Sequence, residues 1–137
     1  FSYIQKTGHS YWASGNENLF YYWQPPHMMP EIFRHMDIAL IPTKGTEGTS
    51  LSCLEAMAAG CAVITTCVGG LSDLIIDGFN GLLIKPTAEN LINAIEYLIQ
   101  NEAERNRLSQ NAKLTAEAFD IRRWKQKWQK VISKVFN

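Results

Sequence analysis

The sequence predicts an α/β domain in which a parallel sheet carries helices on both faces, followed by further helices. Short apolar runs rich in β-branched or aromatic residues alternate with amphipathic stretches up to about residue 100. Strands that alternate with helices in this way form parallel sheets. The runs 38–41 and 82–84 are almost continuously apolar, which is typical of strands buried on both faces. Beyond residue 100 the pattern is helical only, and no internal repeat or linker divides the chain.

The individual elements follow from apolar periodicity and from the glycine, proline and asparagine residues that bound them. Gly60 and Gly78 are expected to end two of the helices, because glycine is the usual residue after a helix C-terminus. The predicted strands are 1–6, 19–23, 37–43, 62–68 and 81–86. The predicted helices are 29–36, 50–59, 71–77, 88–100, 102–119 and 120–136.

The composition is that of one globular domain, with 137 residues of which 46% are hydrophobic. A formal charge of zero argues against a general nucleic-acid binder, which would carry a basic excess. The 3 cysteines form no C-x-x-C pair and the 3 histidines show no metal-like spacing. We therefore expect reduced thiols in a cytoplasmic protein, with no metal and no cofactor.

The sequence shows neither a transmembrane segment nor a signal peptide. No apolar run reaches the roughly 18 residues of a transmembrane helix. The first residues lack the basic start and the cleavage site of a signal peptide. They also lack an initiator methionine and read as a strand already under way, so we expect the chain to be part of a longer protein.

The loop KGTEGTS (44–50) joins the strand predicted at 37–43 to the helix predicted at 50–59, and it is the candidate site. In open α/β sheets, ligands bind beyond the carboxyl ends of the strands, where loops lead into helix N-termini. The free N–H groups of the first helical turn and the helix dipole together form an anion site. Gly48 allows the backbone to approach a ligand closely.

Two glutamates flank this anion site: Glu47 precedes the helix, and Glu55 lies eight positions later (55 − 47). A carboxylate can accept hydrogen bonds from two vicinal hydroxyls, so two carboxylates beside a phosphate suit a nucleotide sugar. The alternative is structural, because Ser52-x-x-Glu55 fits a capping box and Glu47 would then be a solvated loop charge. Spacing alone does not decide between the ligand-binding role and the structural role. The sequence contains neither a P-loop nor a dinucleotide-binding fingerprint.

Longer motifs around the glutamates carry a family resemblance. The E-x7-E pair runs into EAMAAG at Gly60, and AVITTCVGGLSD and DGFNGLLIKP follow in order. These motifs resemble the C-terminal, donor-binding domain of retaining GT-B glycosyltransferases of the family-four type, the glycosyl transferases group 1. The resemblance extends from about residue 18 to 120. It implies a Rossmann-like domain that is a partial C-terminal half of the GT-B fold.

The resemblance also implies roles for single residues. Glu47, the candidate catalytic residue, matches the residue that holds the hydroxyls of the donor sugar, and Glu55 matches the one that holds the ribose. The family often has EGFGLP where this chain has EGTSLS from Glu47, and often has glycine in place of Trp23. The backbone amides that match those at the sugar and the distal phosphate belong to Gly48, Thr49, Ser50 and Leu51. The weaker candidates for contact with the base are Trp23, Gln24 and Pro25.

For the whole protein the resemblance implies sugar transfer, with retention, from a nucleotide-sugar donor (UDP-, GDP- or another) to an acceptor. The acceptor is expected to be a glycan or a lipid-linked molecule. The hypothesis for the mechanism is front-face attack assisted by the leaving phosphate, with both glutamates positioning the donor. The family's cationic residues, first strand and acceptor domain would precede this chain, so the chain alone is expected to be inactive. The alternatives are a nucleotide-sugar epimerase of the same architecture and a non-catalytic nucleotide-binding or scaffold module.

The last predicted helix has one apolar stripe and a strongly basic remainder. We expect residues 1–118 to form the partial nucleotide-sugar-binding domain and 119–137 to form an amphipathic helix of the same unit. The stripe is expected to pack back on the missing domain. The alternative is peripheral contact with the inner face of a membrane, which sedimentation with anionic liposomes would detect. The stripe consists of Ile121, Trp124, Trp128, Val131, Ile132 and Val135.

Overall fold

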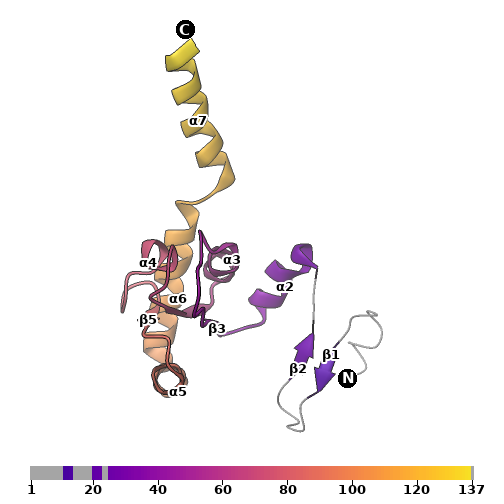
Figure 1. Cartoon of the computed structure of the whole chain (residues 1–137), viewed down its shortest axis with the longest axis vertical. Coiled ribbons are helices and arrows are strands. Elements are labelled where there is room, and N and C mark those ends of the chain that lie inside the picture. The colour runs from indigo at the N-terminus through magenta and orange to yellow at the C-terminus, as the bar shows by residue number, and fades with distance from the viewer. Residues whose placement is uncertain (1–10, 14–19, 23–24, 137) are drawn as a thin grey trace.

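A computed structural model of the protein describes residues 11–13, 20–22 and 25–136. A parallel sheet in the order β3-β4-β5 lies at its centre, with helices on both faces (Figure 1). The predicted α/β class is thereby confirmed. The strands of this sheet are β3 (Ile38–Ile41), β4 (Ala62–Thr66) and β5 (Leu82–Ile84). The helices are η1 (Pro26–Met28), α2 (Met29–Arg34), α3 (Leu51–Ala59), α4 (Leu71–Leu74), α5 (Ala88–Gln100), α6 (Glu102–Glu117) and α7 (Ile121–Phe136).

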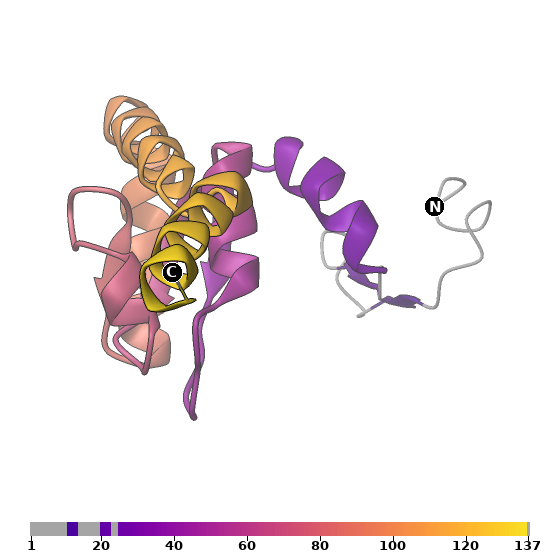
Figure 2. The same ribbon diagram turned by 90° about the horizontal axis from the view of Figure 1, so that it is seen from above.

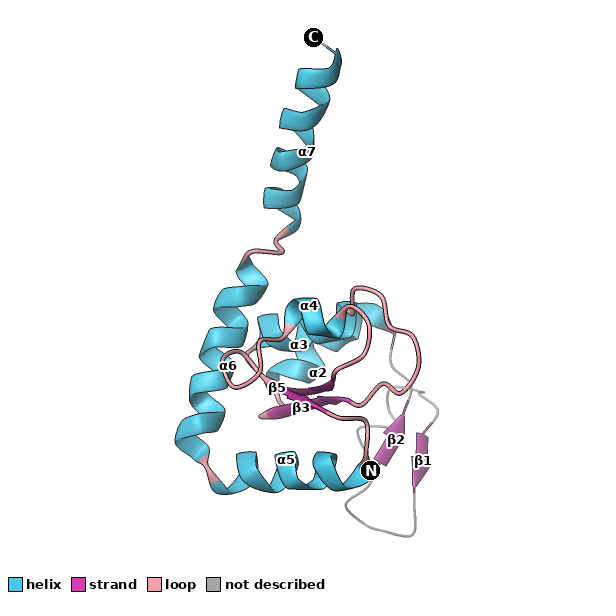
Figure 3. Ribbon diagram, turned by 60° about the vertical axis from the view of Figure 1, so that its left-hand side comes forward, coloured by secondary structure: helices cyan, strands magenta, loops and turns pink. Residues whose placement is uncertain are grey.

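Strand β4 is the middle strand and is buried along its whole length. Its side chains alternate between two apolar clusters, because successive side chains of a strand point to opposite faces of the sheet. Val63 packs with α3 and α4 residues on one face, and Ile64 packs with α5 residues on the other. Figure 3 shows the same layers, with α3 and α4 on one side of the sheet and α5 on the other.

The first described strands do not join this sheet. Strands β1 (Tyr11–Ala13) and β2 (Phe20–Tyr22) pair with each other in antiparallel fashion. The alternation of strands and helices predicts that the strand at 19–23 lies in the parallel sheet, and this prediction is wrong for β2. The connection 14–19 is shorter than the dozen or more residues of a parallel crossover, whereas antiparallel neighbours need only a short loop. The strand predicted at 1–6 lies outside the described residues.

Helix α3 begins and ends at residues whose chemistry explains its bounds. The Ser50 hydroxyl accepts a hydrogen bond from the Cys53 backbone N–H at 3.4 Å, which caps the N-terminus. Gly60 ends the helix with a φ of 90°, a left-handed conformation that favours glycine. Helix α5 begins in the same way, with the Thr87 hydroxyl accepting from the Asn90 N–H at 3.2 Å. Its bounds agree with the predicted helix 88–100.

Helix α4 ends earlier than the sequence predicted, at Leu74 rather than before Gly78. Ile75 has an extended backbone, with φ −104° and ψ 122°. The buried Asn80 side chain explains this end, because its Oδ1 accepts from the Ile76 N–H at 2.7 Å and its Nδ2 donates to the Leu74 carbonyl at 3.0 Å. One asparagine thus satisfies the backbone groups that further helical turns would have used.

Helix α6 fastens two loops to the rest of the domain through side chains that donate to main-chain carbonyl oxygens. One loop lies between α3 and β4, and the other lies between α4 and β5. Helix α6 therefore holds one segment before β4 and one segment after it. The bonds run from Arg107 to Gly78 at 2.7 Å, from Ser109 to Gly60 at 2.6 Å and from Asn111 to Phe79 at 2.9 Å.

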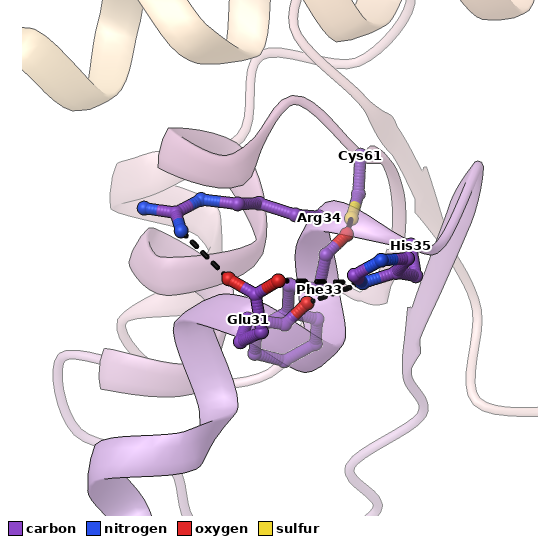
Figure 4. A network of polar contacts seen from close by, with 5 residues as sticks. All are labelled: Glu31, Phe33, Arg34, His35 and Cys61. Atoms are coloured by element: carbon purple, nitrogen blue, oxygen red, sulfur yellow. Dashed lines mark hydrogen bonds and ion pairs between the residues drawn. The ribbon is translucent and has the colours of Figure 1, made fainter.

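The C-terminus of α2 is attached to the start of β4 by a buried thiol (Figure 4). Cys61 Sγ lies 3.2 Å from the Phe33 carbonyl oxygen, to which the thiol donates. Burial and, secondarily, the charge of Asp37 raise the pKa of Cys61 to about 11, so the thiol keeps its proton. On the exposed side of α2, Arg34 pairs with Glu31 at 2.8 Å, and His35 Nδ1 lies 2.8 Å from the Glu31 carbonyl oxygen (Figure 4).

Helix α7 extends away from the sheet and its flanking helices (Figure 1, Figure 3). Figure 2 shows the same helix foreshortened, with the C-terminus toward the viewer. None of its side chains is buried, and the apolar stripe that the sequence predicts is exposed along the helix. Trp124 and Trp128 lie on this stripe with their ring centroids 6.0 Å apart. Among the described residues, no helix is long and apolar enough to cross a membrane.

Candidate functional site

The candidate site lies in the segment 42–50, which leaves the C-terminal end of β3 and enters α3, and which we call the Glu47 loop. Its position follows from the parallel sheet, because the carboxyl ends of β3 and β4 meet at one edge and their loops lie together there. Gly48, within the loop, has no atom within 4 Å of the place where a Cβ would stand. The backbone is therefore open to an approaching ligand at this residue.

A row of unused backbone donors leads from this loop into α3. Within residues 25–136, the N–H groups from Gly48 to Ser52 donate to no acceptor. The first N–H after this row that has an acceptor is that of Cys53, which donates to the Ser50 hydroxyl. The next is that of Leu54, which donates to the Ser50 carbonyl at 3.1 Å. Consecutive free N–H groups at the positive end of a helix dipole form an anion-binding site.

Glu47 is held at both its carboxylate and its main chain. Thr43 Oγ1 donates to Glu47 Oε2 at 3.2 Å, and the Gly70 N–H donates to the Glu47 carbonyl oxygen at 3.1 Å. Burial raises the pKa of the Cys53 thiol to about 12, and the negative charge of Glu47 adds to the shift. The Glu47 residue is thus fixed by Thr43 of its own loop and by the turn after β4.

Glu55 lies on the surface of α3 that faces the end of α6. It is partly exposed and lines a cavity of about 390 Å³ together with Lys113 and Phe119. Glu47 is not among the residues that line this cavity. The described residues include no hydrogen-bond or ion-pair partner for the Glu55 carboxylate, which leaves both oxygens available to a ligand.

The capping-box alternative for Glu55 is wrong. A capping box joins the N-cap residue to the third residue of the helix, and here these are Ser50 and Cys53. Ser52 is already the second residue of α3, and Glu55 is too far along the helix to reach its first N–H groups. The sequence left the N-cap ambiguous, because Ser50 and Ser52 both carry a hydroxyl that could cap the helix.

The remaining candidates are less well defined. Trp23 and Gln24 lie outside the described residues, so their assignment to the base stays a prediction. Pro25 is extended, with φ −64° and ψ 147°, and precedes η1. Among the described residues, no group of three or more histidine, cysteine or acidic side chains could hold a metal ion.

Three residues that support Glu47 were given no role by the sequence. Thr43 bonds its carboxylate, and Thr66 Oγ1 donates to the Thr43 carbonyl from the end of β4. The third is Gly70, which bonds its carbonyl. The available signal was the glycine pair 69–70 after the predicted strand 62–68. Such a pair indicates that another backbone approaches closely, but it does not identify which one.

Comparison with solved structures defines the class of fold to which this geometry belongs. Sucrose-phosphate synthase from Thermosynechococcus elongatus superposes with a TM-score of 0.68 and 29% identity, over 73% of this chain and 25% of that one. The Anabaena protein HepE, crystallised in complex with UDP, superposes with a TM-score of 0.73 and 24% identity, over 77% of this chain and 29% of that one. The fold is thus the Rossmann-like α/β domain of GT-B proteins.

The sequence comparisons define the family. Residues 11–115 match the family Glycosyl transferases group 1, and the chain belongs to this family. D-inositol 3-phosphate glycosyltransferase from Arthrobacter sp. strain FB24 is 37% identical over 103 residues, which are 72% of this chain and 24% of that protein. The chain thus spans about a quarter of the length of this relative, and the suspected family resemblance is confirmed.

Proposed function

We propose that this chain is the donor-binding part of a retaining glycosyltransferase, which transfers a sugar from a nucleotide-sugar donor to an acceptor hydroxyl. The observation that carries the proposal is the row of free N–H groups from Gly48 to Ser52, with Glu47 before it and Glu55 beyond it. Family membership and relatives that are named as sugar transferases support the same reaction class.

The diphosphate of the donor would lie at the start of α3. Its charge is matched by the free amides of Gly48, Thr49, Ser50 and Leu51 and by the helix dipole. These groups also stabilise the negative charge that grows on the diphosphate as the bond to the sugar breaks. They need no reorganisation during the reaction, because the cap at Ser50 already fixes the first turn of the helix.

The two glutamates would hold the hydroxyls on either side of the diphosphate. Glu47 would accept from the hydroxyls of the sugar, and Glu55 from those of the ribose. With about 1.5 Å of rise per residue, Ser50 and Glu55 are roughly 7–8 Å apart along the helix axis, which leaves room for phosphate between them. Both residues position the donor rather than transfer a proton, and front-face attack with the leaving phosphate as base requires no more of them.

The acceptor site and the remainder of the sheet would lie on residues beyond this chain. The matched segment is 24% of the Arthrobacter relative, so the chain alone is proposed to be inactive. Helix α7, residues 121–136, would pack its exposed apolar stripe on that remainder as part of the same unit. Peripheral contact with a membrane is the competing outcome, and liposome sedimentation separates the two.

Glu55 provides the sharpest test of the donor site. In the full-length protein, Glu55→Gln is expected to weaken the affinity for a nucleoside diphosphate about tenfold or more, because charged hydrogen bonds to two hydroxyls are lost. Isothermal titration calorimetry measures this change. Glu117→Gln is the matched control, because Glu117 lines the same cavity from α6, whereas the proposed contact with the ribose belongs to Glu55 alone.

A dideoxynucleotide completes the test. A nucleoside diphosphate that lacks both ribose hydroxyls should bind the wild type and Glu55→Gln equally well. If Glu55→Gln binds the ribonucleotide as tightly as Glu117→Gln does, the ribose role is wrong and a scaffold function gains support.

A further inference from the structure

The turn after β4 packs directly against the main chain of the Glu47 loop. Gly69 and Gly70 form this turn, and the Gly70 N–H donates to the Glu47 carbonyl oxygen at 3.1 Å. A Cβ on Gly70 would lie 2.5 Å from the Gly48 carbonyl oxygen and 2.9 Å from its carbon. A Cβ on Gly69 would overlap with the Glu47 carbonyl oxygen. The obstructing atoms are main-chain atoms, so no side chain can move aside to make room.

The two glycines are required for different reasons. Gly69 has a φ of +56°, so its left-handed backbone disfavours other residues even without a neighbour. Gly70 has φ −69° and ψ −4°, which any residue can adopt. At Gly70, therefore, only the contact with the Glu47 loop excludes a side chain. This makes position 70 a clean probe of the packing between the two loops.

The contact sets the direction of an amide in the candidate site. A trans peptide holds its carbonyl and its N–H on opposite sides. Because the Glu47 carbonyl points to Gly70, the N–H of the same peptide, which belongs to Gly48, points away from the turn. That N–H is the first of the free donors that lead into α3. The turn thus holds the Glu47–Gly48 peptide from the side opposite its free N–H.

A second connection fixes the side chain of Glu47 from the same strand. Thr66, the last residue of β4, donates its hydroxyl proton to the Thr43 carbonyl, and the Thr43 hydroxyl bonds the Glu47 carboxylate. The end of β4 therefore holds the main chain of Glu47 through Gly70 and its carboxylate through Thr66 and Thr43. These contacts restrict the three side-chain torsions of Glu47.

We propose that Gly69 and Gly70 are positioning residues for the donor site, which fix the Glu47–Gly48 peptide in the orientation that sugar transfer requires. This inference rests on the proposed function. Both glycines act through Glu47 and Gly48, and neither touches the donor. The space occupied by one methyl group at position 70 is enough to displace the loop, and a displacement near 1 Å can cost about a hundredfold in rate.

The test is Gly70→Ala in the full-length protein, with Gly78→Ala as the matched control. Gly78 has a φ of +69°, but nothing lies within 4 Å of its Cβ position, so alanine there strains the backbone without touching the Glu47 loop. Gly70→Ala is expected to lower kcat/KM for sugar transfer by about a hundredfold. Gly78→Ala is expected to retain wild-type kcat/KM despite a lower melting temperature.

A double-variant cycle shows whether Gly70 acts through Glu47. A displaced loop misplaces both the Glu47 carboxylate and the Gly48 N–H, and Glu47→Ala removes only the first. The double variant should therefore lose less kcat/KM than the product of the two single losses. Effects that multiply would overturn the inference, as would wild-type kcat/KM in Gly70→Ala. If Glu47→Ala itself leaves transfer unchanged, the proposed role of Glu47 fails, and the two failures are thereby distinguished.

Thr66→Val keeps the test decisive if Gly70→Ala does not fold. This variant leaves Gly69 and Gly70 unchanged and replaces the hydroxyl that bonds the Thr43 carbonyl with a methyl group, which cannot donate a hydrogen bond. It is expected to lower kcat/KM in the same direction and to be non-additive with Glu47→Ala. Unchanged kcat/KM in a folded Thr66→Val protein would contradict the positioning role of the β4 end.

Discussion

Helices α3 and α5 begin in almost the same way, yet only α3 begins at the candidate site. Each follows a parallel strand, and each has a hydroxyl residue as its N-cap, Ser50 in α3 and Thr87 in α5. The segment before α5, residues 85–87, is exposed and short. The Glu47 loop before α3 is longer and is bonded to the end of β4. Both helices thus have a dipole, but only α3 is preceded by a loop that is bonded to a neighbouring strand and the turn after it.

The largest difference between the two helix starts should appear in catalysis. Glu47→Ala in the full-length protein is expected to lower kcat/KM for sugar transfer by about a hundredfold or more, because the donor sugar loses its positioning carboxylate. Glu89→Ala removes the acidic residue from the first turn of α5 and should leave transfer unchanged. Release of radiolabelled sugar from the nucleotide donor measures both. Equal rates in the two variants would remove the distinction between the helices.

A smaller and equal effect is expected on stability. Ser50→Ala and Thr87→Ala each remove one capping hydroxyl, so each should lower the free energy of unfolding by about 1 kcal/mol. Urea denaturation measures this change. Since Ser50→Ala retains its backbone N–H, affinity for a nucleoside diphosphate should survive the substitution. A large loss of affinity would assign the hydroxyl, rather than the amide, to the phosphate.

The last effect depends on pH and concerns Cys53, which stands in the first turn of α3 where α5 has Asn90. Burial, with a further contribution from Glu47, raises the pKa of this thiol to about 12 in the folded protein. The unfolded chain releases the thiol proton near pH 9, whereas the folded protein retains it. Stability from this group is therefore complete below about pH 9 and is lost as the pH rises toward 12.

Unfolding midpoints in urea between pH 8 and pH 11 measure this loss. Cys53→Ala should decline less steeply over this range than the wild type, with the remainder due to Cys61, whose pKa is raised to about 11. Cys67 is exposed, so Cys67→Ala should follow the wild-type curve. Identical curves for Cys53→Ala and the wild type would contradict the raised pKa.

Local sequence patterns were sufficient for the elements whose stabilising contacts are local. Helix α5 agrees with its predicted bounds because its cap and its apolar face both lie within 87–100. The strands β3, β4 and β5 follow from continuous apolar runs. The end of α4 could not be predicted in this way, since it depends on the side chain of Asn80, which lies beyond the helix. The pairing of β1 with β2 likewise depends on partners that periodicity does not identify.

The same distinction applies to the candidate site. Glu47, Gly48 and Glu55 lie in one contiguous stretch, and helix physics together with the family resemblance was enough to select them. Thr66 and Gly70 support the loop from another strand, and only the folded backbone shows that contact. A glycine pair indicates that something approaches closely. Which segment approaches the glycine pair depends on how β3 and β4 are paired, and sequence patterns alone do not reveal that register.

Helix α6 has a consequence for how this protein can diverge. Its Arg107, Ser109 and Asn111 hold neighbouring loops by their carbonyl oxygens, which every amino acid carries. Substitutions in those loops at surface positions can therefore accumulate over generations without loosening the attachment. The selective constraint falls instead on three side chains of one helix, and replacing them would release both loops at once.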